Sequence, residues 1–260
     1  MSRHHARRAA RRGFTVVEVL VVVAVIALLV GLLLPGLAMV RRASLVTTDL
    51  SNLRGLSVAH LAYQNANNDR FVDVGLPHGS VADPANSFVE RLRPYYGDHA
   101  TDISFRSPLD ASPHWPAELG GDGVPVVEGT PPVYRRTSYG MNNYLSRTYS
   151  PAVALDGIGA GVDRATQIAD PERTVCFLLM VERGSFASAD HPHVEDWASS
   201  PDPATTAATQ VAIAAAQPPG EKPSPDARSN YAFIDGHVRT QAFGEVYRDA
   251  QRNQFDPALR

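Results

Sequence analysis

The chain has 260 residues, of which 24 are basic and 27 acidic, and its formal net charge is −3. This length fits one membrane anchor plus one globular domain of ordinary size. The charge is uneven, because residues 1–13 hold five arginines and no acid; without them, 19 basic residues face 27 acidic ones, a net charge of −8. An acidic body offers no basic surface for nucleic acid, so no nucleic-acid partner is predicted.

Cys176 is the single cysteine, so no disulfide can form within the chain. It lies in an apolar, strand-like run, where a thiol behaves as a small core side chain.

A long apolar stretch follows the arginine-rich start. From Val19 to Val40 no residue is charged, and about 20 apolar residues in a helix span a bilayer. Glu18, directly before this stretch, is an ionisable group that is costly to place in lipid. The basic residues before it predict a cytoplasmic N-terminus and a body on the other side of the membrane, by the positive-inside rule.

The segment Arg11-Arg12-Gly13-Phe14-Thr15-Val16-Val17-Glu18, with the apolar run after it, resembles the prepilin cleavage and methylation segment of type IV pilins and type II secretion pseudopilins. The resemblance implies that prepilin peptidase/N-methyltransferase cuts after Gly13 and methylates the new terminus at Phe14. It also makes Glu18 the acid used in assembly. The physics agrees, since the new amine at Phe14 is a natural partner for the Glu18 carboxylate of a neighbouring subunit.

Two other interpretations of this segment compete with the prepilin one. A secretory signal peptide has a shorter apolar core and a small-residue cleavage site, whereas this core is longer and carries Glu18. An uncleaved membrane anchor with an accidental glutamate is the remaining one.

The resemblance and the residue pattern together predict an α+β, pilin-like fold, with one long helix packed on an antiparallel sheet. Residues 1–13 are the cleaved basic leader, 14–40 the transmembrane helix and 41–260 an extracytoplasmic head. Proline and glycine at Pro35-Gly36 predict a kink or local melting.

The head is expected to begin with an amphipathic helix over residues 41–68. Val46, Leu50 and Leu53 recur at helical spacing and form the predicted buried stripe, while Asp49 falls among the polar positions. The helix should end between Tyr63 and Asn68.

Three further segments of the head carry structural signals. Ser87–Arg93 predicts a short helix, and Thr174–Val181 a central strand. Residues 198–225 form a low-complexity insertion, read either as a helix over Pro203–Gln217 capped by Asp202 or as an exposed, mobile segment. Residues 71–134 resemble the variable connection of pilin-like proteins, where surface recognition is expected.

Residues 230–240 predict a hairpin. Asp235-Gly236 favours a two-residue turn in which both positions have positive φ. This stretch, with Thr137–Tyr144, partly resembles the H-x9-DG family of pilin-like proteins abundant in planctomycete-type bacteria. That family's histidine position is occupied here by Pro225.

His191, His193 and Glu195 are metal-ligand types close in sequence. Pro192 disturbs any helix there, so a polar loop is the default and no metal or other cofactor is predicted. The glycine-rich Asp156–Gly161 lacks the Lys-Ser/Thr of a phosphate loop. We therefore expect no catalysis.

The predicted function is a structural subunit of a type IV pilus or a type II secretion pseudopilus-like filament. Its expected partners are the prepilin peptidase/N-methyltransferase, like or related pilin subunits, and inner-membrane lipid. The alternative is a membrane-tethered extracytoplasmic binding module that uses a pilin-like anchor. The sequence does not choose among secretion, adhesion, motility and DNA uptake.

Overall fold

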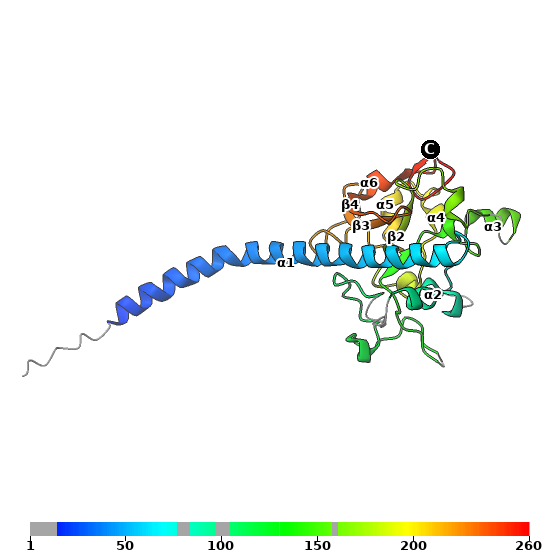
Figure 1. Cartoon of the computed structure of the whole chain (residues 1–260). Coiled ribbons are helices and arrows are strands. Elements are labelled where there is room, and N and C mark those ends of the chain that lie inside the picture. Colours follow the sequence, from blue (N-terminus) through cyan, green and yellow to red (C-terminus); the bar gives the residue numbers. More distant parts are fainter. Residues whose placement is uncertain (1–14, 77–83, 97–104, 130, 158–160, 260) are drawn as a thin grey trace, which may run out of the picture. The chain divides into compact units, whose positions relative to one another are not determined.

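The computed structural model describes residues 15–76, 84–96, 105–129, 131–157 and 161–259. The chain divides into two units, Met1–Arg41 and Arg42–Arg260. One helix, α1 (Val16–Ala66), contributes to both units, and the sheet strands all lie in the second unit (Figure 1). A long apolar helix combined with an antiparallel sheet is an α+β, pilin-like arrangement, which confirms the predicted fold class.

Helix α1 is continuous over 51 residues. The helix continues through Pro35 and Gly36, so the backbone does not melt at this pair. A proline removes only one backbone donor, and the turns on either side keep their own hydrogen bonds. The helix ends at Ala66, within the predicted range, and the chain then turns through Asn68 and Asp69, whose φ angles are 56° and 60°.

Four antiparallel strands form the main sheet of the head, in the order β1-β2-β3-β4. Each strand pairs with its neighbour in this order, so there is no crossover among them. Their bounds are Tyr139–Met141, Val175–Leu179, Arg228–Phe233 and Val238–Ala242 for β1 to β4; a separate two-stranded sheet holds β5 (Tyr247–Asp249) and β6 (Arg252–Asn253).

The central strand β2 is buried on both faces. Phe177 and Leu179 pack in the core cluster that contains α1, whereas Val175 and Leu178 pack in a second cluster. A register shift between Val175 and Phe177 places Cys176 on the same side as Phe177, as a bulge does. Burial on both faces explains why this strand reads as a continuous apolar run rather than an alternating one.

Residues 198–225 supply part of the second core cluster. Ala204, Ala207, Val211 and Ile213 are buried there against the sheet face that carries Tyr231. The helix α5 covers only Pro203–Ala207 and is therefore shorter than the predicted one. The predicted cap is present, since the Asp202 side chain accepts the backbone N–H of Thr205. Residues 204–213 therefore cover the sheet, whereas residues 218–223 are exposed.

The remaining helices of the head are short. The prediction of a helix over Ser87–Arg93 is confirmed by α2, which Ser87 precedes. The α-helices are α2 (Phe88–Leu92), α3 (Pro151–Asp156), α4 (Val194–Trp197), α5 and α6 (Phe243–Val246); 3-10 turns include η1 (Pro84–Asn86), η2 (Arg93–Tyr95), η4 (Ala117–Leu119), η5 (Asn143–Leu145), η6 (Ala165–Gln167) and η7 (Ser185–Ser188).

The hairpin between β3 and β4 is present, but its turn differs from the predicted one. The N–H of Gly236 donates to the carbonyl of Phe233 at 2.9 Å, and Gly236 alone in this turn has positive φ, at 88°. Asp235 instead accepts the N–H of His237 at 3.1 Å. This is the longer hairpin class, in which a glycine in the left-handed region follows the turn.

The prediction that Asp49 lies on the polar face of the helix is wrong. Its side chain is completely buried between α1 and the sheet. One oxygen accepts the hydroxyls of Ser107 at 2.5 Å and Tyr139 at 2.9 Å, and the other accepts the Asn230 amide at 2.8 Å. Burial raises the pKa of Asp49, and these three hydrogen bonds oppose that rise. Asp49 thus joins α1 to β1, to β3 and to the loop at Ser107.

A buried arginine fastens the region before β1. The guanidinium of Arg135 bonds the Asp110 carboxylate at 2.7 Å. It also donates to the carbonyls of Met180, Val181 and Ala187. The end of the region predicted to be a variable connection is therefore tied to the chain that follows β2.

His60 of α1 is an uncharged core residue. Its ring packs against Phe71 and Phe177, with ring centroids 5.6 and 5.2 Å away. Nε2 accepts the backbone N–H of Val72 at 3.3 Å, so the neutral ring carries its proton on Nδ1. Burial lowers the pKa of His60 to about 3.

We expect Asp49→Leu to lower the free energy of unfolding by about 3 kcal/mol or more, because three buried donors lose their acceptor. Asp49→Asn should cost less, since it keeps one acceptor oxygen. Urea unfolding of the protein in detergent micelles, followed by tryptophan fluorescence, measures both changes. Thr48→Ala, at an exposed position of the same helix, is the control and should stay within about 0.5 kcal/mol. An Asp49→Leu variant as stable as wild type would contradict the stabilising role of these three hydrogen bonds.

Because His60 is buried in its neutral form, we expect the free energy of unfolding to fall in acid. Its pKa falls from 6.5 to about 3 on folding, so its contribution is intact above pH 6.5 and is lost as the pH falls toward 3. The slope from this one proton is about 1.4 kcal/mol per pH unit. The free energy of unfolding of His60→Gln, measured at pH 6 and 4, should fall less steeply than that of wild type. Equal slopes would mean that the imidazole is not held neutral.

Candidate assembly site

The predicted assembly residues lie at the start of the chain. Gly13 and Phe14 are outside the residues that the structure describes, which begin with Thr15. Glu18 is described and lies in the first turn of α1. The geometry of the site is therefore the geometry around Thr15 and Glu18.

Thr15 and Glu18 form a capping box. The backbone N–H and the hydroxyl of Thr15 donate to Glu18 Oε2 at 2.8 and 2.9 Å, and the N–H of Glu18 donates back to the Thr15 hydroxyl at 3.2 Å. The Thr15 carbonyl accepts the N–H of Val19, as expected of the residue before a helix. The spacing Thr-x-x-Glu is the one that lets the two side chains satisfy each other's backbone donors.

The second carboxylate oxygen of Glu18, Oε1, has no hydrogen-bond partner within the described part of the chain. The side chain is exposed. One oxygen is thus held by the helix start, while the other is oriented and open to a cation. A carboxylate fixed in this way loses little conformational freedom when it binds an ammonium group.

The surface around this carboxylate is apolar and uncovered. From Val16 to Val40 the large apolar side chains are 47% to 80% exposed, with Val30 and Val16 at the two limits. By length and composition α1 can cross a membrane. Water does not stabilise so large an apolar surface, so this part of the helix is suited to lipid or to the helices of other subunits.

His191, His193 and Glu195, which the sequence places close together, are only partly brought together in the structure. His193 Nδ1 lies 3.0 Å from Glu195 Oε1, but His191 faces Asp190, with Nδ1 3.0 Å from its carboxylate. His191 is buried, and the ring of Tyr149 packs against it in a tilted arrangement with the ring centroids 4.5 Å apart. Over the described ranges, no group of three His, Cys, Asp or Glu side chains is placed to share an ion.

The electrostatics of His193 and Glu195 follow from their contact. The hydrogen bond to Glu195 raises the pKa of His193 and outweighs the effect of partial burial. Burial acts to raise the pKa of Glu195, but the hydrogen bonds from His193 and Asn143 lower it overall. The two groups form a polar pair that starts α4.

Two residues that the sequence analysis did not single out matter here. For Thr15 the sequence does carry a signal, because the Thr-x-x-Glu spacing within the processing motif is also that of a capping box. Asp49 has none, because a polar residue on an amphipathic helix is normally read as solvent-facing. Its role depends on Ser107, Tyr139 and Asn230, which lie far away in sequence.

A long apolar helix that begins with a capping box at Glu18, together with a head that holds an antiparallel sheet, is a pilin-like arrangement. Residues 8–34 match the family model of the prokaryotic N-terminal methylation motif. The match includes Gly13, Phe14 and Glu18, and it supports a type IV pilin-like protein that is processed as a prepilin. Neither a curated protein nor a solved structure matched the chain. The resemblance to the H-x9-DG family stays a prediction.

We expect Thr15→Val to loosen the first turn of α1, because the hydroxyl that bonds Glu18 is lost. The cost should be about 1 kcal/mol, which corresponds to roughly fivefold faster hydrogen exchange at the Glu18 amide. Exchange measured by NMR in micelles tests this. Thr15→Ser should restore protection, and Thr47→Val, farther along the same helix, should leave the first turn unchanged. Equal exchange in Thr15→Val and wild type would argue against the capping box.

Proposed function

We propose that this chain is a structural subunit of a filament of the type IV pilus or type II secretion pseudopilus kind. In this proposal the leader is cut off after Gly13 and the new amine at Phe14 is N-methylated. The apolar part of α1 then holds the subunit in the inner membrane until it is extracted into the filament. The chain is assigned no catalytic step.

The observation that carries the proposal is the position of Glu18. It is the one charged residue between Val16 and Val40, and it lies in the first turn of a helix whose apolar side chains are uncovered. A carboxylate among lipid chains costs a few kcal/mol near the bilayer centre. Such a residue needs a partner, and the methylation motif around it supports processing that would create one.

The partner is the amine of Phe14 on a neighbouring subunit. Cutting after Gly13 converts an amide into a cationic amine four residues before Glu18. In a low-dielectric bundle of helices the two charges attract strongly, whereas either one alone is penalised. Pairing of the two charges therefore stabilises the assembled filament, and the open Oε1 of Glu18 gives the amine a defined place to bind.

The proposed orientation follows from the leader. Five arginines before Gly13 favour a cytoplasmic N-terminus, which puts the head in the periplasm or outside the cell. The partners are the prepilin peptidase/N-methyltransferase, lipids of the inner membrane, and other pilin subunits.

A second candidate function is a membrane-tethered binding module that uses α1 only as an anchor. A polar pocket in the head, lined by several arginines, favours it. The two functions differ in what Glu18 does, because a tethered module needs no intersubunit charge.

We expect Glu18→Gln to be processed but not assembled. Glutamine keeps an acceptor for Thr15 and so preserves the helix start, while the charge that attracts the amine is lost. Mass spectrometry of the mature N-terminus should detect methyl-Phe14 in both proteins. The sheared filament fraction should fall at least tenfold in the variant.

Glu172→Gln is the matched control, since Glu172 is an exposed glutamate of the head, and it should assemble as wild type does. Normal filaments from Glu18→Gln would favour the tethered module. If the wild-type protein retains its leader, no free amine forms at Phe14, and neither N-methylation nor charge-driven assembly can take place as proposed.

A further inference from the structure

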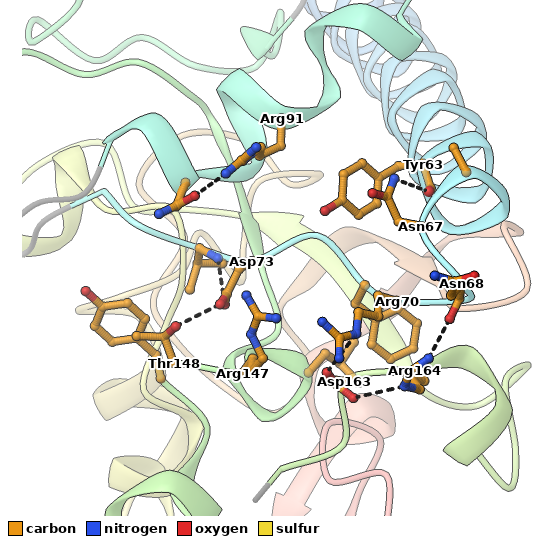
Figure 2. Close-up of a pocket in the computed structure, with 16 residues that line it drawn as sticks. Tyr63, Asn67, Asn68, Arg70, Asp73, Arg91, Arg147, Thr148, Asp163 and Arg164 are labelled. Atoms are coloured by element: carbon orange, nitrogen blue, oxygen red, sulfur yellow. Dashed lines mark hydrogen bonds and ion pairs between the residues drawn. The ribbon is translucent and has the colours of Figure 1, made fainter. Parts of the chain in front are cut away.

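A pocket of about 540 Å³ opens in the head beside the end of α1. Its wall contains the last turns of α1 with Tyr63, the segment after the helix with Arg70, the α2 helix with Arg91, and the loops that carry Arg147 and Arg164. Figure 2 shows these side chains converging from four separate stretches of the chain. The volume lies in the range of small-ligand sites.

The pocket is basic, although the protein is acidic. Four arginines line it, and their carboxylate neighbours are Asp73 and Asp163. Asp163 lies 3.8 Å from both Arg70 and Arg164. Asp73 accepts the hydroxyls of Ser146 at 2.5 Å and Thr148 at 2.8 Å and makes no ion pair with an arginine in the described part of the chain. The four arginines outnumber the two aspartates. A positive excess remains in a chain whose net charge is −3.

Arg147 is the free cation of this group. Its guanidinium makes no hydrogen bond or ion pair with any residue that the structure describes, and its side chain is exposed. In Figure 2 it extends from its loop into the space between Asp73 and Arg70. Arg91, across the pocket, bonds the side chain of Asn86. A guanidinium presented without a partner is suited to an anionic group of a ligand.

The walls are held in place before any ligand arrives. The Arg164 guanidinium donates to the carbonyl of Asn68 at 2.8 Å, and the N–H of Phe71 donates to the carbonyl of Asp163 at 2.8 Å. The turn that leads to Arg70 uses left-handed conformations at Asn68 and Asp69, which cost more than ordinary backbone. These two residues form the turn that ends α1, in which the N–H of Asp69 donates to the carbonyl of Gln64 at 3.0 Å.

We propose that this pocket binds an acidic saccharide, that is, a sugar carrying a carboxylate or sulfate group. Arg147 and Arg91 provide the fork-like donors that match such an oxyanion. The side-chain amide of Asn68 lines the same space and matches sugar hydroxyls. Asn67 and Thr148 donate their hydrogens within the chain, so their side-chain oxygens are the atoms left to accept from a sugar hydroxyl. A filament or tethered head with such a site would recognise an anionic glycan surface, whichever of the two proposed functions holds.

The test is calorimetric titration of the full-length protein in micelles at low ionic strength. The probes are a uronic acid disaccharide, a sulfated disaccharide, the neutral disaccharide lactose, and sulfate ion. At least one acidic disaccharide should bind, with lactose at least tenfold weaker. Binding by one acidic disaccharide and not the other supports the proposal and identifies the oxyanion.

Arg147→Ala should weaken the acidic disaccharide tenfold or more, because one charge-assisted contact is lost. Its thermal unfolding should be unchanged, since Arg147 bonds nothing in the described fold. Arg173→Ala is the matched control, because that arginine is exposed and lies outside the pocket.

Three results would overturn the proposal: no binding of either acidic disaccharide, equal binding of lactose, or sulfate ion binding as tightly as the disaccharides. An Arg147→Ala variant that binds like the control would do the same. These results are independent of filament assembly, so they leave the proposed function to its own test.

Discussion

The head depends on one buried carboxylate. Asp49 is the point at which α1 is fixed to the sheet, because its two oxygens accept donors from Ser107, Tyr139 and Asn230. Apolar contacts hold helix and sheet together without fixing their register, since they are non-directional. Three hydrogen bonds to one buried carboxyl group are directional and are strengthened by the surrounding low dielectric. The apolar stripe with Leu53 and Leu56 selects the face of the helix that meets the core, and the Asp49 cluster fixes the register of that face on the sheet.

The same helix carries a second carboxylate with a different role. Asp49 is satisfied within its own chain, whereas Glu18 is satisfied on only one oxygen, by Thr15. The first charge specifies how a subunit folds. In the proposed function the second specifies how subunits meet. A carboxylate that is taken out of water needs a hydrogen-bond or charge partner. Asp49 finds its partners within its own chain, whereas the proposed partner of Glu18 is on a neighbouring subunit.

Much of the fold is readable from the sequence, since its signals are local. The apolar run of α1, the strand β2 and the hairpin at Gly236 each show their periodicity or turn residues directly. The hairpin turn type was not readable, because Asp-Gly also fits a turn in which only the glycine has positive φ.

The candidate sites divide in the same way. Glu18 is evident because a charge in an apolar run is rare, but Asp49 and Arg147 depend on loops that approach from far away in sequence. For the alanine-rich residues 198–225 the sequence leaves both a helix and an exposed insertion open, since short side chains show no clear period. In the structure these small side chains pack closely over the second face of the sheet.

The position of Cys176 determines how its thiol behaves in an oxidising compartment. Its thiol is completely buried beneath α1, and burial raises its pKa well above the ordinary value. Disulfide exchange requires an accessible thiolate. In the oxidising compartment proposed for the head, the folded protein is therefore protected from covalent cross-linking to other thiols, and only a molecule that has not finished folding is vulnerable.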